Sequence, residues 1–286
     1  MKGDDFVFTK MSGAGNIFLL GDLRQFQNQQ AWSQTTASGV NRNQLARLLC
    51  QQGAGFCADG LLFLETCSGD SDFQWDFYNA DGSQAEMCGN AARCVARFAH
   101  RQGGVDNTMS FKTIAGTIRA ELLEGDLVQV EMPRLGEPEW DRYVTIDEQK
   151  THYHFINSGV PHAVVGNDNV ILTEEVRLFA SRLRNHIDLQ PDGANVTFFQ
   201  PTRVGEIEAV TYERGMENFT QACGTGAVAA AWCHYQRQQG PKKVIVGMPG
   251  GQLRVDFSQE KPLLSGPAVF LGQVSLDSEF FQQEVI

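Results

Sequence analysis

MCGNAARC at residues 87–94 and QACGTGAVAAA at residues 221–231 share one construction: a cysteine, a glycine, and then small residues that turn apolar. After Cys88 the apolar residues recur at helical spacing, and after Cys223 they soon run without a break. Each cysteine is therefore predicted to stand at the start of a helix. A helix that is apolar on all sides belongs inside a packed layer, so the second helix is predicted to be buried.

The sequence that precedes each cysteine is also repeated. FYNADGSQAEMC, which ends at Cys88, aligns with TYERGMENFTQAC, which ends at Cys223, with one extra residue in the second copy. The alignment matches Asn79 with Glu213 and places the copies about half a chain length apart. A single Cys-Gly match is common by chance, but a strand, a turn, a Cys-Gly pair and a small-residue helix in the same order are not. The chain is therefore predicted to contain two homologous domains.

Short β-rich runs, separated by Gly, Asp, Asn and Pro, fill most of the remaining sequence. Amphipathic helices are predicted at residues 41–52 and 173–186. Many strands and one buried helix in each half predict an α+β fold in which a sheet wraps around a central helix, twice. We expect a first domain at residues 1–134, to which residues 266–286 return, and a second domain at residues 135–265.

The composition narrows the classes of function. A net charge of −11 argues against a nucleic-acid or anionic-membrane partner, because both require basic patches. The first residues lack the apolar core of a signal peptide, and no apolar run is long enough to span a bilayer. A cytoplasmic protein without a membrane partner is expected.

The cysteines and histidines do not form recognisable metal or disulfide patterns. Seven cysteines are an odd number, which argues against a disulfide framework. The spacing of Cys57 and Cys67 does not suit a structural zinc site. His152, His154 and His186 are expected at the surface, and their spacing to carboxylates predicts no metal site.

Two cysteines at helix starts indicate acid–base chemistry. A helix start offers unpaired N–H groups and a positive dipole end, which bind anions and lower the pKa of a thiol. The amides at Gly89–Asn90 and at Gly224–Thr225 are therefore expected to bind a substrate carboxylate. With one thiol on each face of the α-carbon, one removes the proton and the other returns it. The product is the inverted stereocentre, and this chemistry requires no cofactor.

The same residues carry a resemblance to a known family. Over nearly its whole length the chain resembles diaminopimelate epimerase, in FTKMSGAGNIF (8–18), GFCADGLLFLE (55–65), FYNADGSQAEMCGNAARCVARF (77–98), SGVPHAVV (158–165), GANVTFFQ (193–200), YERGMENFTQACGTGAVAAA (212–231) and SGPAVFLGQV (265–274). The resemblance implies two pseudo-symmetric domains, each a mostly antiparallel, barrel-like sheet around a central helix. It implies an isomerase that converts LL-2,6-diaminopimelate to meso-diaminopimelate for lysine and peptidoglycan precursors, without pyridoxal phosphate or metal. A homodimer is a candidate assembly.

The resemblance also implies roles for individual residues. Cys88 and Cys223 become the acid–base pair. The residues expected to contact the substrate are Asn16, Asn79, Gly89, Asn90, Asn195, Glu213, Arg214, Gly224 and Thr225, with His162 and Asn157 as neighbours of the site.

The chain departs from the family pattern at two positions. Ile17 stands where the family often has aspartate, and Val160 stands where many members have asparagine. A second interpretation is thus a cofactor-independent racemase of proline, hydroxyproline or histidine on the same fold. A cysteine hydrolase with His162 as base would use only one of the two thiols, and an amino-acid-binding module would need neither.

GAGNIF at residues 13–18 is predicted to be a turn, because the third glycine of a dinucleotide-binding loop is missing.

Overall fold

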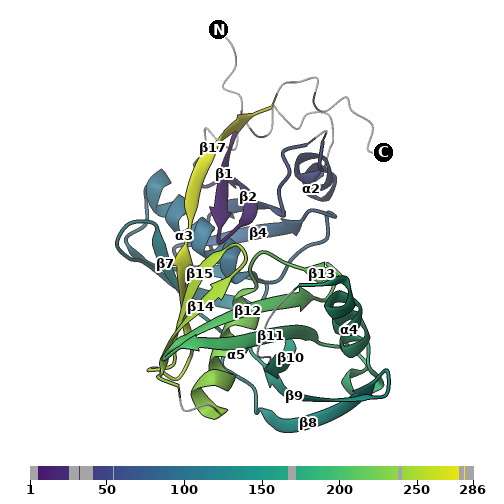
Figure 1. Cartoon of the computed structure of the whole chain (residues 1–286). Coiled ribbons are helices and arrows are strands. Elements are labelled where there is room, and N and C mark those ends of the chain that lie inside the picture. Colours follow the sequence, from purple (N-terminus) through teal and green to yellow (C-terminus); the bar gives the residue numbers. More distant parts are fainter. Residues whose placement is uncertain are drawn as a thin grey trace. The chain divides into compact units, whose positions relative to one another are not determined.

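The structure, a computed structural model, describes residues 6–25, 32, 41–53, 55–166, 172–237, 240–276 and 280. The chain divides into two compact units (Figure 1). The first unit comprises Met1–Val130 and Pro267–Ile286, and the second comprises Glu131–Gly266. The first unit is therefore built from two separate stretches of sequence, and the second from one.

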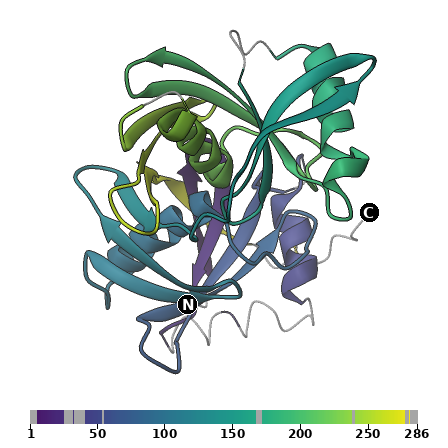
Figure 2. The ribbon, with the colours of Figure 1, turned by 90° about the horizontal axis from the view of Figure 1, so that it is seen from below.

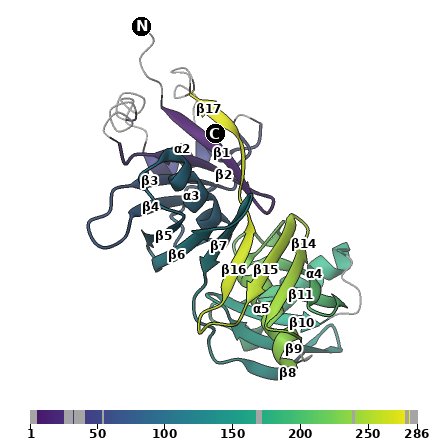
Figure 3. The ribbon, with the colours of Figure 1, turned by 90° about the vertical axis from the view of Figure 1, so that its left-hand side faces the viewer.

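The first unit contains one mixed sheet, which follows the chain from β1 to β7 and receives β17 at its beginning. Within the described residues its strands are β1 (Val7–Gly13), β2 (Asn16–Asp22), β3 (Gly60–Glu65), β4 (Phe73–Asn79), β5 (Thr108–Thr113), β6 (Gly116–Leu122), β7 (Leu127–Glu131) and β17 (Val269–Ser275). The pairs β2–β3 and β4–β5 are parallel. The pairs β17–β1, β1–β2, β3–β4, β5–β6 and β6–β7 are antiparallel. Figure 3 shows β17 lying along β1.

The second unit repeats this succession of pairings. Its described strands are β8 (Glu139–Ile146), β9 (Gln149–Asn157), β10 (Pro161–Gly166), β11 (Asn195–Arg203), β12 (Glu206–Glu213), the short β13 (Asn218–Phe219), β14 (Lys243–Met248), β15 (Gly251–Asp256) and β16 (Leu263–Pro267). The pairs β10–β11 and β12–β14 are parallel. The pairs β8–β9, β9–β10, β11–β12, β14–β15 and β15–β16 are antiparallel. Strand by strand, the parallel and antiparallel pairs therefore come in the same order in both units.

One buried helix joins the second parallel pair in each unit. α3 (Gly89–Gln102) leads from β4 to β5, and α5 (Gly224–Arg237) leads from β12 to β14. α3 packs against β1, β2, β3 and β6, and α5 against strands from β9 to β15. In Figure 2 the yellow-green helix α5 is seen among the strands of its unit. The predicted α+β fold, a mostly antiparallel sheet around a central helix in each half, is confirmed.

A second helix joins the other parallel pair in each unit. α2 (Arg42–Cys50) lies between β2 and β3, and α4 (Glu174–Arg184) lies between β10 and β11. Asn41 closes the start of α2 in a capping box with Gln44, and Thr173 accepts a hydrogen bond from Val176 at the start of α4. Both helices were predicted from their periodicity. None of the helices described here is both long and apolar enough to cross a membrane.

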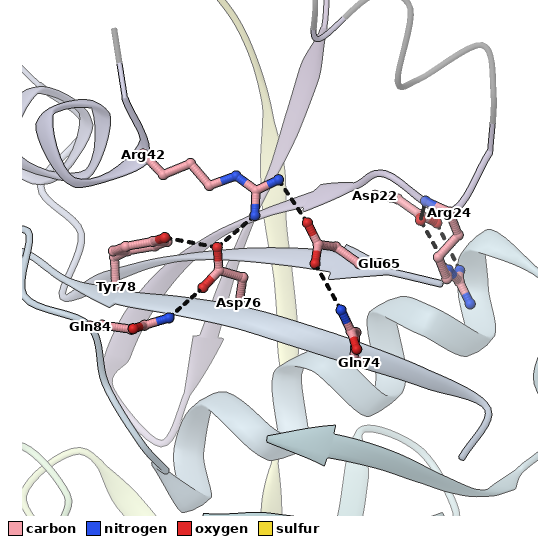
Figure 4. A network of polar contacts seen from close by, with 8 residues as sticks. All are labelled: Asp22, Arg24, Arg42, Glu65, Gln74, Asp76, Tyr78 and Gln84. Atoms are coloured by element: carbon pink, nitrogen blue, oxygen red, sulfur yellow. Dashed lines mark hydrogen bonds and ion pairs between the residues drawn. The ribbon is translucent and has the colours of Figure 1, made fainter. Parts of the chain in front are cut away.

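A polar network ties α2 to the sheet and to the segment that leads into α3 (Figure 4). The Arg42 guanidinium lies 2.7 Å from Glu65 on β3 and 2.5 Å from Asp76 on β4. Asp76 also accepts hydrogen bonds from the Tyr78 hydroxyl and from Gln84. Gln84 forms an isolated β-bridge with Tyr78. The side chain and the backbone of Gln84 therefore both hold the segment between β4 and α3 in place.

Candidate active site

Each unit gathers its candidate residues at one edge of its sheet. β2 begins at Asn16 and β4 ends at Asn79. Because β2 and β3 are parallel and β4 is antiparallel to both, the start of β2 and the end of β4 share an edge. In the second unit, β11 begins at Asn195 and the antiparallel β12 ends at Glu213. The sites proposed from sequence therefore occupy topologically equivalent places.

Both cysteines stand at the starts of the central helices, as predicted. The Cys88 carbonyl accepts the Ala92 N–H at 2.9 Å, and the Cys223 carbonyl accepts the Ala227 N–H at the same distance. The Cys88 thiol is half-buried and does not cap its helix, whereas the Cys223 sulfur lies 3.4 Å from the Gly226 N–H. Gly89 and Gly224, which follow the two cysteines, are buried first residues of α3 and α5.

The first half-site begins at a tight turn. β1 and β2 pair up to Gly13 and Asn16, and Ala14 and Gly15 between them have φ of 52° and 90°. This is the left-handed backbone of a two-residue hairpin turn, so the expectation of a turn is confirmed. A Cβ on Gly13 would lie 2.7 Å from the Asn90 carbonyl oxygen. Glycine is therefore required where β1 meets the first turn of α3.

A chain of hydrogen bonds then connects Asn16 to the interior of the unit. Asn90 donates to the Asn16 Oδ1 at 2.6 Å and accepts from the Arg93 Nη2 at 2.7 Å. Asn16 donates to Asp59, which also accepts the Ile17 N–H at 2.7 Å. Both ends of the Asn90 amide are therefore committed, and the orientation of Asn16 follows from them.

Two members of this chain were not predicted from sequence. Arg93 occupies the i+3 position from Asn90 and the i+4 position from Gly89, which places it on the same helix face. Asp59 lies in a loop before β3, where spacing gives no signal. Asn79 lies outside the chain: its amide donates to the Ser83 hydroxyl at 3.0 Å, and it is exposed.

The second half-site is a buried network around His162. Its ring lies 2.9 Å from Thr197 Oγ1 through Nδ1 and 2.9 Å from Thr225 Oγ1 through Nε2. The Thr225 hydroxyl in turn lies 3.4 Å from the Cys223 sulfur. Asn195 approaches the His162 Nε2 at 3.4 Å. The sequence-predicted residues His162, Asn195, Thr225 and Cys223 are therefore brought together.

The start of α5 is held close to the sheet and to the turn before β10. A Cβ on Gly226 would overlap the hydroxyl of Thr211, so only glycine fits there. The Ser158 hydroxyl donates to the Thr225 carbonyl at 2.8 Å. Gly159, with φ of 119°, passes beside Thr225. These contacts fix the amides that follow Cys223.

The remaining candidates of this half-site lie nearer the surface. The Arg214 N–H donates to Asn195 Oδ1 at 2.8 Å, while its exposed guanidinium donates to the Asp192 carbonyl at 3.1 Å. Glu213 accepts a hydrogen bond from the Thr220 hydroxyl. Asn157 is exposed, and its side-chain oxygen accepts the N–H of Gly159 at 3.0 Å.

One surface expectation is wrong. His154 is buried at 9% exposure, and antiparallel pairing of β8 with β9 brings Asp141, His152 and His154 together, with ligand atoms within 4.8 Å. The spacing of these residues in the sequence did not reveal the cluster, because the pairing of β8 with β9 brings together residues more than ten positions apart. The Asp141 carboxylate already contacts His152 at 3.0 Å and Arg237 at 2.5 Å. The backbone N–H of Asp141 donates to His154 Nδ1. In this structure the cluster is a polar network built around the Asp141–Arg237 ion pair.

Burial of His162 makes the stability of the protein pH-dependent. Burial lowers the pKa of His162 to about 3 from an ordinary 6.5. Between these values the unfolded chain binds the proton and the folded chain does not, so the free energy of unfolding falls as the pH drops. The loss is up to about 1.4 kcal/mol per pH unit for this group. Above pH 6.5 the His162 ring is neutral in both the folded and the unfolded chain, so it no longer makes the free energy of unfolding depend on pH.

Denaturant unfolding of the parent protein and of His162→Gln between pH 7 and pH 4 measures this. The gap between the two free energies of unfolding is expected to shrink as the pH falls. A gap for His162→Gln that does not change with pH would contradict the assignment of a neutral buried ring.

Comparison with known proteins identifies the family of this chain. The family model described as diaminopimelate epimerase matches residues 8–138 and 154–271. The chain belongs to the diaminopimelate epimerase family. The diaminopimelate epimerase of Aquifex aeolicus is 38% identical over 276 residues, which cover 94% of this chain and 97% of that protein. The diaminopimelate epimerase of Hydrogenobaculum sp. is 35% identical over 282 residues, which cover 95% and 99%.

Solved structures support the fold. The crystal structure of a hydroxyproline epimerase from Agrobacterium vitis with bound trans-4-hydroxy-L-proline matches with a TM-score of 0.69, over 95% of this chain and 93% of that one. Its sequence identity of 18% supports the shared architecture alone. Of the two departures from the diaminopimelate epimerase family pattern, Ile17 packs against the core of the first unit. The Val160 carbonyl accepts the Ser158 N–H at 3.2 Å.

Proposed function

We propose that the protein epimerises LL-2,6-diaminopimelate to meso-diaminopimelate, with Cys88 and Cys223 as the acid–base pair. The observation that carries the proposal is the repeated placement of the thiols. In both units the strand that ends in a candidate polar residue leads to a Cys-Gly helix start at an equivalent place in the sheet. Membership in the diaminopimelate epimerase family supports the assignment of diaminopimelate as the substrate.

The chemistry requires both thiols to reach one α-carbon from opposite faces. One thiolate removes the α-proton, and the other thiol delivers a proton to the opposite face, so that the stereocentre inverts. The carbanion delocalises its charge into the adjacent carboxylate. The amides at Gly89–Asn90 and Gly224–Thr225, which begin α3 and α5, supply donors for that charge. These groups provide the base, the acid and the anion site, and we propose a cofactor-independent reaction.

Recognition of the substrate is assigned to the polar groups of the two half-sites. Asn16 Oδ1 is taken by Asn90, so its amide nitrogen, which approaches Asp59 at 3.4 Å, is the group left to donate to substrate. Arg214 carries an exposed guanidinium that fits a carboxylate with paired hydrogen bonds. Diaminopimelate has a second amino-acid centre with one charge of each sign, which these groups match. We further propose that the enzyme acts in the cytoplasm.

The α-proton exchange of LL-diaminopimelate in deuterated water tests the proposal. Proton NMR is expected to show loss of the α-proton signal together with formation of the meso isomer. Proline, hydroxyproline and histidine, assayed side by side at equal concentration, are expected to exchange at least about 10²-fold more slowly. They leave the buried or paired polar groups unmatched, at about 1–3 kcal/mol each.

The competing function is racemisation of a single-headed amino acid on the same fold. Val160, at the position where an asparagine was expected, is the feature that favours it. Exchange of proline or histidine at a rate comparable with diaminopimelate would establish this second function and overturn the first. Activity that disappears with chelator and returns with a metal ion would overturn the cofactor-independent chemistry.

A further inference from the structure

The hairpin of β8 and β9 carries a cluster of side chains that the proposed acid–base chemistry does not use. Asp141, His152 and His154 each offer a ligand atom, and these atoms all lie within 4.8 Å of one another. His152 and His154 are alternate residues of β9, so their side chains leave the same face of the strand. Asp141 comes from β8. The whole cluster therefore belongs to one hairpin of the second unit.

β8 is distorted at the point where it supplies the carboxylate. The pairing with β9 shifts register between Glu139 and Arg142, and Asp141 has a φ of 54°. A positive φ is uncommon for a residue other than glycine, and a bulge of this kind re-aims a side chain. The Asp141 Oδ1 lies 3.0 Å from His152 Nε2 and 4.0 Å from His154 Nδ1. One oxygen therefore faces two imidazole nitrogens.

These separations suit a small divalent cation with nitrogen and oxygen ligands. Bonds of about 2.0–2.1 Å in a tetrahedral Zn²⁺ site place neighbouring ligand atoms about 3.3 Å apart. The separations of 3.0 Å and 4.0 Å bracket that value. Imidazole suits Zn²⁺ and other first-row metals, whereas Mg²⁺ prefers oxygen. The side chains of His152 and Asp141 are 44% and 46% exposed, so an ion can enter from solvent and keep a water ligand.

His154 is in the form that a metal ion requires. Its ring is buried, and burial, followed by the neighbouring His152, lowers its pKa, so the imidazole is neutral at neutral pH. Its Nδ1 accepts the Asp141 N–H at 3.1 Å and therefore carries a lone pair rather than a proton. The edge of Trp140 packs against the ring. An ion on Nδ1 replaces this hydrogen bond, and the N–H of the exposed Asp141 can then bind water.

Arg237 is the cation closest to this cluster. It pairs with the Asp141 Oδ2 at 2.5 Å, which leaves Oδ1 directed at the imidazoles. Its charge opposes a metal ion, while its ion pair holds the carboxylate in place. Arg237 is also the last residue of α5, a helix of 14 residues. At 1.5 Å per residue, the cluster contacts the end of α5 that lies about 20 Å from the Cys223 end.

We propose that Asp141, His152 and His154 form a binding site for Zn²⁺, or for another first-row divalent cation that prefers imidazole. The bound ion joins β8 to β9 and, through Asp141 and Arg237, holds both strands to the end of α5. None of the three ligands is assigned to the acid–base pair or to the substrate. The site is therefore a structural metal site of the second unit, additional to the proposed function.

NMR of the histidine side chains tests the site in the parent protein. The chain has six histidines, whose imidazole ¹H–¹⁵N signals are assigned with single His→Gln variants. On titration with Zn²⁺, the signals of His152 and His154 are expected to shift together. They should saturate at a Zn²⁺ concentration at least about tenfold below that which shifts His186, because chelation by several groups raises affinity. His186 lies 3.6 Å from the single carboxylate of Asp188 and is the internal control. Mg²⁺ should shift none of them.

A pair of variants tests the ligand set. His152→Gln removes an exposed ligand and is expected to weaken Zn²⁺ binding, read from the His154 signal, by at least about tenfold. His186→Gln is the matched control and should leave that affinity unchanged. Signals of His152 and His154 that ignore Zn²⁺, or move only when His186 moves, would overturn the proposal. The parent titration requires no variant to fold. It involves no turnover, so its result is independent of the proposed function.

Discussion

Replacement of Cys88 or Cys223 by alanine is expected to lower the rate of epimerisation by about 10⁴-fold, the upper end of what one acid–base group contributes. Each thiol serves one face of the α-carbon, so neither variant can use the other thiol to complete the inversion. The measurement is the conversion of LL- to meso-diaminopimelate, followed by proton NMR or by separation of the isomers. Unfolding curves of both variants should resemble that of the parent protein.

The same helices supply the controls. Cys94 on α3 and Cys233 on α5 are fully buried thiols that do not belong to the proposed machinery. Cys94→Ala and Cys233→Ala should retain turnover per folded molecule while lowering stability through a small cavity. Substantial turnover by either Cys88→Ala or Cys223→Ala would exclude the two-base mechanism, whatever the substrate proves to be.

Arg214→Met is expected to lower kcat/KM for diaminopimelate by about 10²-fold or more. Paired, charge-assisted hydrogen bonds to the distal carboxylate are lost, at about 1.5–3 kcal/mol for each bond to a charged group. Methionine keeps much of the length of the side chain and removes the charge. Steady-state kinetics with LL-diaminopimelate measure the effect.

Arg177→Met is the matched control for Arg214→Met. Arg177 lies on α4 of the same unit, and its ion pair with Glu174 joins two residues three positions apart on that helix. It should leave kcat/KM unchanged. Arg214→Lys is expected to recover only part of the loss, because an ammonium does not match both carboxylate oxygens. If Arg214→Met keeps parental kcat/KM, the distal carboxylate is bound elsewhere and the assignment fails.

The fold was largely predictable because its signals are local. Turn residues, apolar periodicity and the repeated Cys-Gly helix start led to α3 and α5, and the caps of α2 and α4 agree with their periodicity. The parallel pairs β2–β3 and β4–β5 were not predicted individually. Strand order depends on contacts between segments far apart in sequence, which the pattern of one strand does not contain.

The site was predictable where its groups follow the repeat and not where they depend on packing. Asn16 and Asn195 were named from the family resemblance, and each begins a strand at the edge where the candidate residues of its unit lie. Arg93 was missed because an arginine on a helix is ordinarily expected to face solvent. His154 was misplaced because a strand pairing, rather than its neighbours in sequence, decides its exposure. Burial of a polar side chain is a property of the assembled unit.

The division of the first unit into two stretches has a consequence for how the protein is made. β1 pairs with β2 on one side and with β17 on the other, and β17 begins only at Val269. A nascent chain leaving the ribosome therefore has one edge of β1 without its backbone partners until the second unit has been synthesised, whereas the second unit is available as one continuous stretch. Unpaired strand edges are templates for association with other chains. Synthesis from the N-terminus therefore favours early folding of the second unit. The sheet of the first unit is completed only when β17 pairs with β1.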